Sequence, residues 1–117
     1  MSKEIIRYDP DKRLSEMVEY AGMLYLAGQV GEDTGVGMRE QTASVLRQID
    51  KLLARGGSDK SKIMSAVVYV ADMRLKPKMD EAWMAWMDPK SSPARATVEA
   101  RLGTADTLVE IMCVAAK

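Results

Sequence analysis

One carboxylate interrupts an apolar run near the end of the chain. The segment "TLVEIMCVAA", residues 107–116, directs apolar side chains to both faces of an extended strand, and Glu110 is the exception. An unpaired carboxylate is costly to bury, so we expect a cation, hydrogen-bond donors or water beside it. Glu110 is therefore the first candidate for chemistry in this sequence.

A second candidate lies in the preceding strand, which we predict over residues 94–102. Side chains alternate along a strand, so Arg95 shares one face with Thr97 and Glu99. Only "GTAD" and its flanking residues separate this strand from 107–116, which predicts that the two strands are antiparallel neighbours. The planar guanidinium of Arg95 suits a carboxylate partner.

Two interpretations of Arg95 and Glu110 follow from this placement. The first is a structural ion pair inside the sheet, in which each charge compensates the other. The second is a ligand site, in which Arg95 binds a ligand carboxylate and Glu110 handles a nearby water. The register of the two strands would decide between these interpretations, and the sequence does not determine it. Both therefore stay open at this point.

The other candidates have plainer explanations. A glycine at the end of a strand, as in "LAGQVG" (26–31), lets a backbone amide approach a ligand, although most such glycines only turn the chain. Cys113 sits in an apolar run and is predicted to be a core residue. Trp83 and Trp86 fit packing of a helix on a sheet. Asp80 is expected in the first turn of that helix, where a carboxylate favours the helix dipole.

Composition excludes several classes of function. The chain is 47% hydrophobic, and ten Met take the place of most aromatic side chains. Net charge is zero and there is no basic stripe, so we expect no nucleic-acid partner. Without His and with one Cys, a Cys/His zinc site and a His-dependent triad are excluded, and we expect no metal. We expect no membrane span, and the single Cys suits a reducing cytoplasm.

The length of 117 residues predicts one domain, 1–117. The fold class is predicted to be α+β, a mixed sheet with two helices on one face. The other face would then need a cover, which association of subunits would provide. The expected strands are 3–8, 16–20, 23–30, 63–73, 94–102 and 107–116, with a tight turn at Ala21-Gly22, and the expected helices are 38–55 and 77–88.

Several segments together resemble one known family. "PARATVEA" and "LVEIMCVAA" are similar to the C-terminal signature of the reactive intermediate deaminases (RidA/YjgF), and "YLAGQVG" and "MDEAW" extend the likeness along nearly the whole chain. The resemblance implies a chorismate mutase-like fold, a homotrimer and ligand clefts between subunits. It also implies hydrolysis of enamines and imines such as 2-aminoacrylate and 2-iminopropanoate to 2-keto acids and ammonium, a detoxification that needs no cofactor.

The resemblance also implies roles for individual residues. The arginine that binds the substrate carboxylate falls on Arg95, and the glutamate that handles water falls on Glu110. The backbone contact at the end of a strand falls on Ala27 and Gly28. We therefore expect Glu110 to face an intersubunit cleft, where it positions a water against the imine carbon.

Three departures from the family's deaminase group concern the substrate contacts. Thr97 stands where that group has Cys, Asp80 stands where it has Asn, and no Tyr is found around Leu14 and Ser15. These changes leave an alternative open, a non-catalytic protein that binds a 2-keto acid or similar carboxylate. Endoribonuclease activity has been attached to some relatives, and the neutral charge and absence of His argue against it here.

Overall fold

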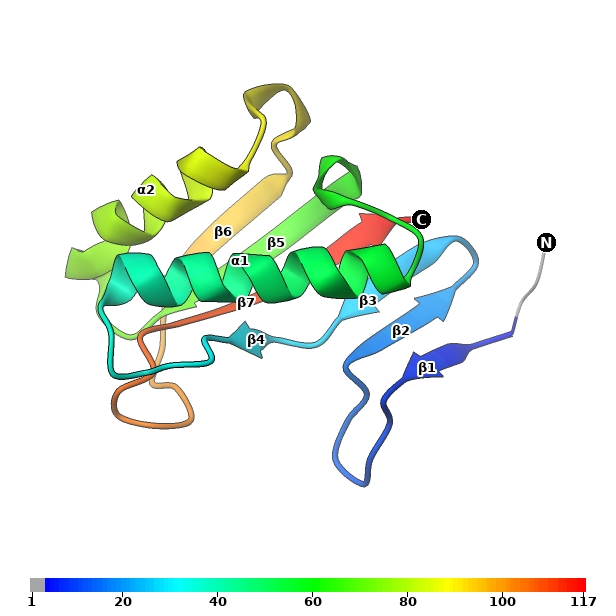
Figure 1. Ribbon diagram of the computed structural model, residues 1–117, viewed down its shortest axis with the longest axis horizontal. Helices are drawn as coiled ribbons and strands as arrows, with labels where there is room; N and C mark the ends of the chain where they lie inside the picture. Colours follow the sequence, from blue (N-terminus) through cyan, green and yellow to red (C-terminus); the bar gives the residue numbers. More distant parts are fainter. Residues whose placement is uncertain (1–3) are drawn as a thin grey trace.

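A single mixed sheet forms the centre of the computed structural model, which describes residues 4–117. Its strands are ordered β1-β2-β3-β7-β5-β6, and β4 pairs with β7 beside β3 (Figure 1). The strands are β1 (Ile6–Tyr8), β2 (Met17–Tyr20), β3 (Met23–Leu26), β4 (Gln29–Val30), β5 (Ile63–Val70), β6 (Ala94–Glu99) and β7 (Val109–Ala116). The start of the predicted strand 3–8, at Lys3, lies outside the described residues.

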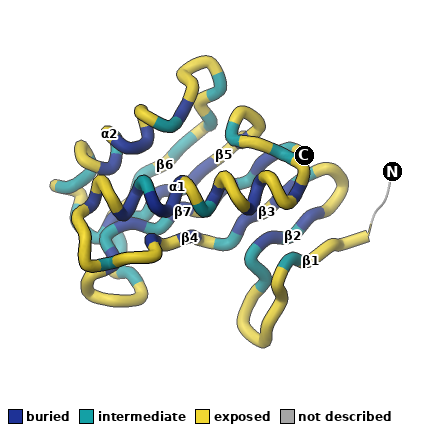
Figure 2. The backbone as a smooth tube through the Cα atoms, viewed as in Figure 1, coloured by how far each residue is buried: buried dark blue, intermediate teal, exposed yellow. Residues whose placement is uncertain are grey.

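Two α-helices, α1 (Met38–Arg55) and α2 (Lys76–Trp86), lie on the same side of the sheet, as predicted (Figure 1). The bounds of α1 agree with the helical spacing of its apolar residues, and Gly57 ends it with a φ of +78°. Figure 2 shows buried and exposed stretches alternating along α1, as expected for a helix that packs one face on a sheet. Neither α-helix of the described chain has the length and hydropathy needed to cross a membrane.

Buried Gln41 anchors the start of α1 to the loop that leads into β7. Its side-chain amide donates to the backbone oxygens of Val36 and Asp106, at 3.0 and 2.9 Å, and its Oε1 accepts from the backbone N–H of Leu108 at 2.9 Å. Both polar atoms of this buried side chain therefore have hydrogen-bond partners within the protein. The contact holds the first residues of β7 against the helix layer.

The first hairpin confirms the predicted turn at Ala21-Gly22, where φ is +50° and +81°. These paired positive values define the tight turn that matches the twist of two antiparallel strands. The predicted strand 23–30 is interrupted, however. Three residues separate Tyr25 from Gln29, while only two separate their partners Val114 and Ile111 on β7. This extra residue is a β-bulge at Ala27-Gly28, and it divides the strand into β3 and β4.

The predicted pairing of the strands 94–102 and 107–116 is wrong. β5 lies between them, parallel to β6 and antiparallel to β7. α2 connects β5 to β6, and a helical crossover of this kind places its two strands parallel and adjacent. The link 100–108 then passes the end of β5, where its backbone exchanges hydrogen bonds with Val70 and Ala71. This link is long enough to skip a strand, which a tight turn is not.

The face of the sheet opposite the helices is apolar and open. Along β7, residues 109, 111, 113 and 115 are buried, while the alternate residues face the open side. Large apolar side chains on this face are 39–45% exposed in the single chain. They come from five strands and include Tyr20, Tyr25, Val30, Val98 and Met112. The expectation of an uncovered face is confirmed for the chain by itself.

Candidate functional site

Arg95 lies on β6 and points toward the helix layer. Its sheet neighbour is buried Ala66 of β5, which fixes the face it occupies. The Nη2 atom donates to Asp80 Oδ1 at 2.8 Å, and the guanidinium carbon lies 5.0 Å from the centre of the Trp83 ring. The side chain is 20% exposed. A guanidinium held by a carboxylate and an aromatic face has a defined orientation while part of it stays accessible.

Asp80 links two cations. Its Oδ1 accepts from Arg95, and its Oδ2 accepts from Lys76 Nζ at 2.7 Å, one helical turn earlier. Burial raises the pKa of Asp80, but the hydrogen bonds from Lys76 and Arg95 outweigh it and hold that pKa below its ordinary value. The expected place in the first turn is wrong, because α2 begins at Lys76 and has no acidic residue there. Asp80 instead forms ion pairs with Lys76 of its own helix and with Arg95 of β6.

A hollow of about 470 Å³ opens beside Arg95 and Asp80. The remaining wall is formed by side chains from α2 and from the loop before β6, namely Trp83, Met84, Met87, Pro89 and Ser92. Four of these five are apolar. Arg95 therefore stands at the edge of a largely apolar space that reaches solvent.

Glu110 lies on β7 and points toward the open face, between Val30 of β4 and Tyr69 of β5. Its carboxylate rests against Gly28 in the β-bulge. A Cβ added at Gly28 would overlap Glu110 Oε2 and would lie 3.0 Å from Cδ. Within residues 4–117 we find no hydrogen-bond donor or cation on this carboxylate, which is partly exposed. Glu110 thus meets water in the single chain.

Glu110 lines a second hollow, of about 330 Å³. Gly28, Tyr69 and Met112 line it from the sheet, and residues 100–103, among them Arg101, line it from the link before β7. The β-bulge is what brings the Gly28 backbone to this point, because a regular strand would carry a side chain past the carboxylate. Glu110 and Gly28 therefore form one local unit.

Within one chain, Arg95 and Glu110 do not share a site. Across the sheet, Arg95 of β6 and Cys113 of β7 both pair with Ala66 of β5. Cys113 is three residues from Glu110, or about 10 Å along the strand, and β6 and β7 lie about 10 Å apart. The side chains also point to opposite faces. The structural Arg95–Glu110 ion pair is thus wrong, and so is the placement of both residues around one ligand within a single chain.

The remaining predicted residues lie near one or the other of these two. Thr97 shares the helix-facing side of β6 with Arg95, as predicted. The N–H of Ala27 donates to the backbone oxygen of Glu16 at 2.9 Å, and its oxygen accepts from Gln29 Nε2 at 3.0 Å. Cys113 is buried in the core, as predicted. Among residues 4–117, no three acidic or cysteine side chains come together as metal ligands.

Three contacts of the site were not predicted from the sequence, namely those of Asp80 with Arg95, of Asp80 with Lys76 and of Arg95 with Trp83. Lys76 and Asp80 stand four residues apart, a spacing that pairs side chains on a helix and could have predicted their ion pair. Trp83 was assigned to packing, and it does pack against the core, but its ring also lies against Arg95. No local pattern indicates this contact with Arg95.

The fold and these residues place the protein in a class of small α+β proteins built on a mixed seven-strand sheet with two helices. The endoribonuclease L-PSP family model matches residues 5–117, and the chain belongs to this YjgF/RidA/RutC family. A RutC family protein from Haemophilus ducreyi is 44% identical over 112 residues, covering 96% of each chain, and the RutC family protein YoaB of Escherichia coli is 40% identical, covering 96% and 97%. A solved YjgF family structure from Neisseria meningitidis superposes with a TM-score of 0.95 at 43% identity, covering 98% of this chain and 96% of that one.

Proposed function

We propose that the protein hydrolyses reactive 2-imino acids and their enamine tautomers to 2-keto acids and ammonium. The observation that carries this proposal is the oriented guanidinium of Arg95 at the mouth of a hollow, with donors left for a second carboxylate. Membership of a family that includes the RidA deaminases supports the reaction type. The carboxylate of Glu110, which is partly exposed and free of a cation within the described chain, supports a role in proton transfer.

The site requires an assembly of copies, for which we propose the homotrimer of the family. Arg95 and Glu110 face opposite sides of one sheet, so a substrate that touches both must lie between two subunits. The open apolar face offers the surface on which copies would associate. In the proposed ring, the Arg95 region of each subunit would lie against the Glu110 region of the next. Each intersubunit cleft would then be complete.

The proposed reaction follows from the two side chains. Arg95 binds the carboxylate of the protonated imine, and Glu110 takes a proton from a water as the water oxygen bonds to the imine carbon, which leaves a neutral carbinolamine. Glu110 then gives that proton to the amino nitrogen. The C–N bond breaks as the hydroxyl proton passes to the departing ammonia, and a 2-keto acid and ammonium leave. The N–H donors of Arg95 and the Gly28 backbone hold the substrate, and we expect no cofactor.

A competition assay tests this function. An amino-acid oxidase generates 2-imino acids, semicarbazide traps them, and the protein competes with the trap. We expect the wild type to reduce the trapped product and Arg95→Ala to lose that effect at unchanged oligomer size. Arg47→Ala, which removes an exposed arginine of α1 that lines neither the hollow beside Arg95 nor the hollow beside Glu110, serves as the matched control. A folded wild-type oligomer that never competes would rule out the deaminase.

Carboxylate binding without turnover is the second candidate. The observation in its favour is that Asp80 already occupies one side of Arg95, whereas Glu110 lies on the other face of the chain. An anion would then bind at Arg95 with no group to activate water. Equilibrium binding of 2-keto acids by calorimetry, together with no effect in the competition assay, would identify this function.

A further inference from the structure

The hollow beside Arg95 has the character of a side-chain subsite. Its volume of about 470 Å³ falls within the range of about 300–1,000 Å³ that is usual for ligand pockets. A ligand carboxylate on Arg95 would stand at its edge, so the rest of the ligand would extend along the wall of α2. The methyl group of an alanine-derived imine would leave most of this space to water.

The wall of this subsite is apolar where a side chain would lie. Trp83, Met84, Met87 and Pro89 provide carbon, sulfur and ring surface, and Ser92 provides one hydroxyl. Met84 is 67% exposed in the single chain, so its side chain is accessible to a ligand in the hollow. Thioether side chains adapt to ligands of different shape. The wall therefore favours hydrocarbon over polar groups.

The charges around the subsite also favour a neutral, apolar side chain. Asp80 is the one acidic residue in its lining, and its two oxygens accept from Arg95 and Lys76. Once a ligand carboxylate is bound at Arg95, the two cations and the two carboxylates balance, so a charged side chain on the apolar wall would find no free partner and would lose its hydration. A neutral hydrocarbon chain meets neither difficulty.

We propose that this hollow binds the side chain of the substrate, and that the substrates are 2-imino acids with large apolar side chains, such as those formed from leucine, methionine and phenylalanine. The inference rests on the proposed deaminase function and adds its substrate class. The Arg95 guanidinium fixes the carboxylate, and the Met and Trp wall receives the hydrocarbon. Oxidation of branched, thioether or aromatic amino acids is the class of reaction that would supply these imines.

A panel of oxidase-generated imines tests the inference. We expect kcat/KM for the leucine-derived imine to exceed that for the alanine-derived imine by about tenfold or more, since added methylenes in an apolar pocket discriminate to this extent. The glutamate-derived imine is expected to be the poorest substrate. Equal rates, or a preference for the alanine-derived imine, would overturn the inference while leaving the deaminase function intact. No turnover of any imine would overturn both.

Two variants separate the subsite from the reaction itself. Met84→Gln places a neutral polar group of similar length on the wall, and Ser92→Phe fills the hollow. Both should lower the ratio of kcat/KM for the leucine-derived imine to kcat/KM for the alanine-derived imine by about tenfold. Met73→Gln, outside the hollow, is the matched control. Equal losses on both substrates would contradict a side-chain subsite.

Binding of products gives a readout that does not need turnover. Trp83 forms part of the wall, so its fluorescence should respond to a ligand in the hollow. We expect 4-methyl-2-oxopentanoate to bind at least about tenfold more tightly than pyruvate in the wild type, and this difference should shrink in Ser92→Phe. Equal affinity for the two keto acids would overturn the inference even if the protein proved to be catalytic.

Discussion

Arg95 and Glu110 lie on opposite faces of one sheet, with β5 between the strands that carry them. Arg95 reaches into the helix layer, where it contacts Asp80 and Trp83. Glu110 reaches the open side, where it rests against Gly28. The sheet lies between the two groups, so in the proposed reaction a second copy supplies one of them. The proposed function therefore depends on assembly.

Mixing two inactive variants tests this dependence directly. Arg95→Ala and Glu110→Gln should each be inactive, because each removes one partner from every cleft. When the two are unfolded and refolded together, random assembly should restore about a quarter of the sites, since some clefts receive both intact residues. The measurement is deaminase activity as a function of the mixing ratio. Activity that stays at the level of the separate variants would mean that each site belongs to one chain.

Gly28→Ala should disable Glu110 without unfolding the chain. The new Cβ would overlap the Glu110 carboxylate, so that side chain must leave its position. We expect kcat to fall by about 10²-fold, as for other small displacements of reacting groups, with thermal unfolding little changed. Gly103→Ala is the matched control, because it lines the same hollow and its Cβ would meet nothing within 4 Å. Equal activity of the two variants would exclude Glu110 from the reaction.

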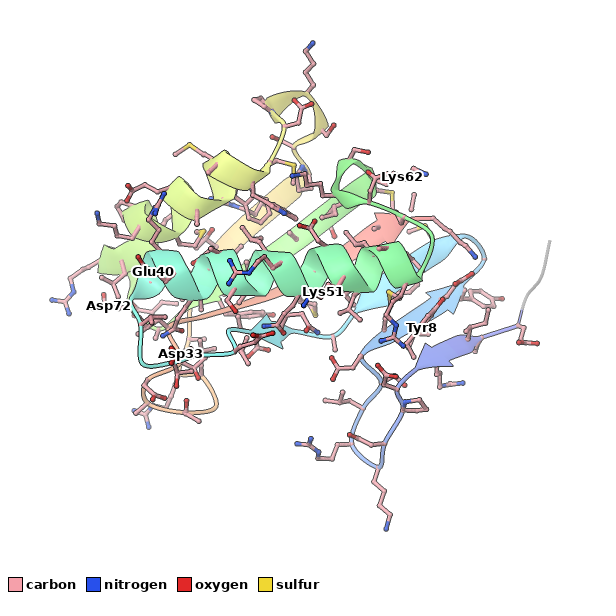
Figure 3. The ribbon with its side chains drawn as sticks, viewed as in Figure 1. Tyr8, Asp33, Glu40, Lys51, Lys62 and Asp72 are labelled. Atoms are coloured by element: carbon pink, nitrogen blue, oxygen red, sulfur yellow. The ribbon has the colours of Figure 1, made fainter. Side chains whose placement is uncertain are left out.

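A charge on the open face should prevent assembly. Tyr25 is 45% exposed on this face in the single chain, and a carboxylate there would be buried without a partner in any interface that covers it. We expect Tyr25→Glu to shift the protein to monomers, measured by light scattering, with unchanged far-ultraviolet circular dichroism. Lys51→Glu on exposed α1 surface is the control and should leave the oligomer intact (Figure 3). An unchanged oligomer in Tyr25→Glu would place the interface elsewhere.

Asp80 should make stability depend on pH. Its pKa in the folded chain lies below the value of about 3.9 in an unfolded chain, so its contribution is present above that value and is lost as the pH falls through the folded pKa. Asp80→Asn should cost about 1–2 kcal/mol at pH 7, between the values for exposed and fully buried pairs. In urea unfolding, the difference in free energy of unfolding between Asp80→Asn and the wild type should narrow below about pH 4.

Asp50→Asn is the control for this pH series, because asparagine keeps an acceptor for Trp86 Nε1 on the neighbouring helix. The difference in free energy of unfolding between Asp50→Asn and the wild type should stay nearly constant over the same pH range. A difference for Asp80→Asn that is equally constant would show that the carboxylate charge adds nothing to the pairing with Arg95 and Lys76.

Cys113 should be inert in the folded protein. Burial raises the pKa of its thiol to about 12, so the thiolate that reacts with alkylating agents is scarce at pH 8. We expect iodoacetamide to label Cys113 only after denaturation, with mass spectrometry as the readout. Rapid labelling of the native protein would mean that β7 opens readily, which its position between β3 and β5 argues against.

The sequence by itself determined the local elements of this protein. The spacing of apolar residues predicted α1 with its observed bounds, and the Ala21-Gly22 turn predicted the first hairpin. Alternation along β6 predicted that Arg95 and Thr97 share a face, and the apolar character of β7 predicted a sheet with an uncovered side. These features depend on residues a few positions apart, so the local sequence is sufficient to predict them.

Only the tertiary structure decided which elements became neighbours. β5 separates β6 from β7 because the α2 crossover pairs β5 with β6, and no short stretch of sequence specifies that choice. The contact of Asp80 with Arg95 and the bulge that carries Gly28 to Glu110 likewise join residues far apart in the chain. Strand partners are selected by the packing of the whole core, which is why the candidate residues were found by sequence but their separation onto two faces was not.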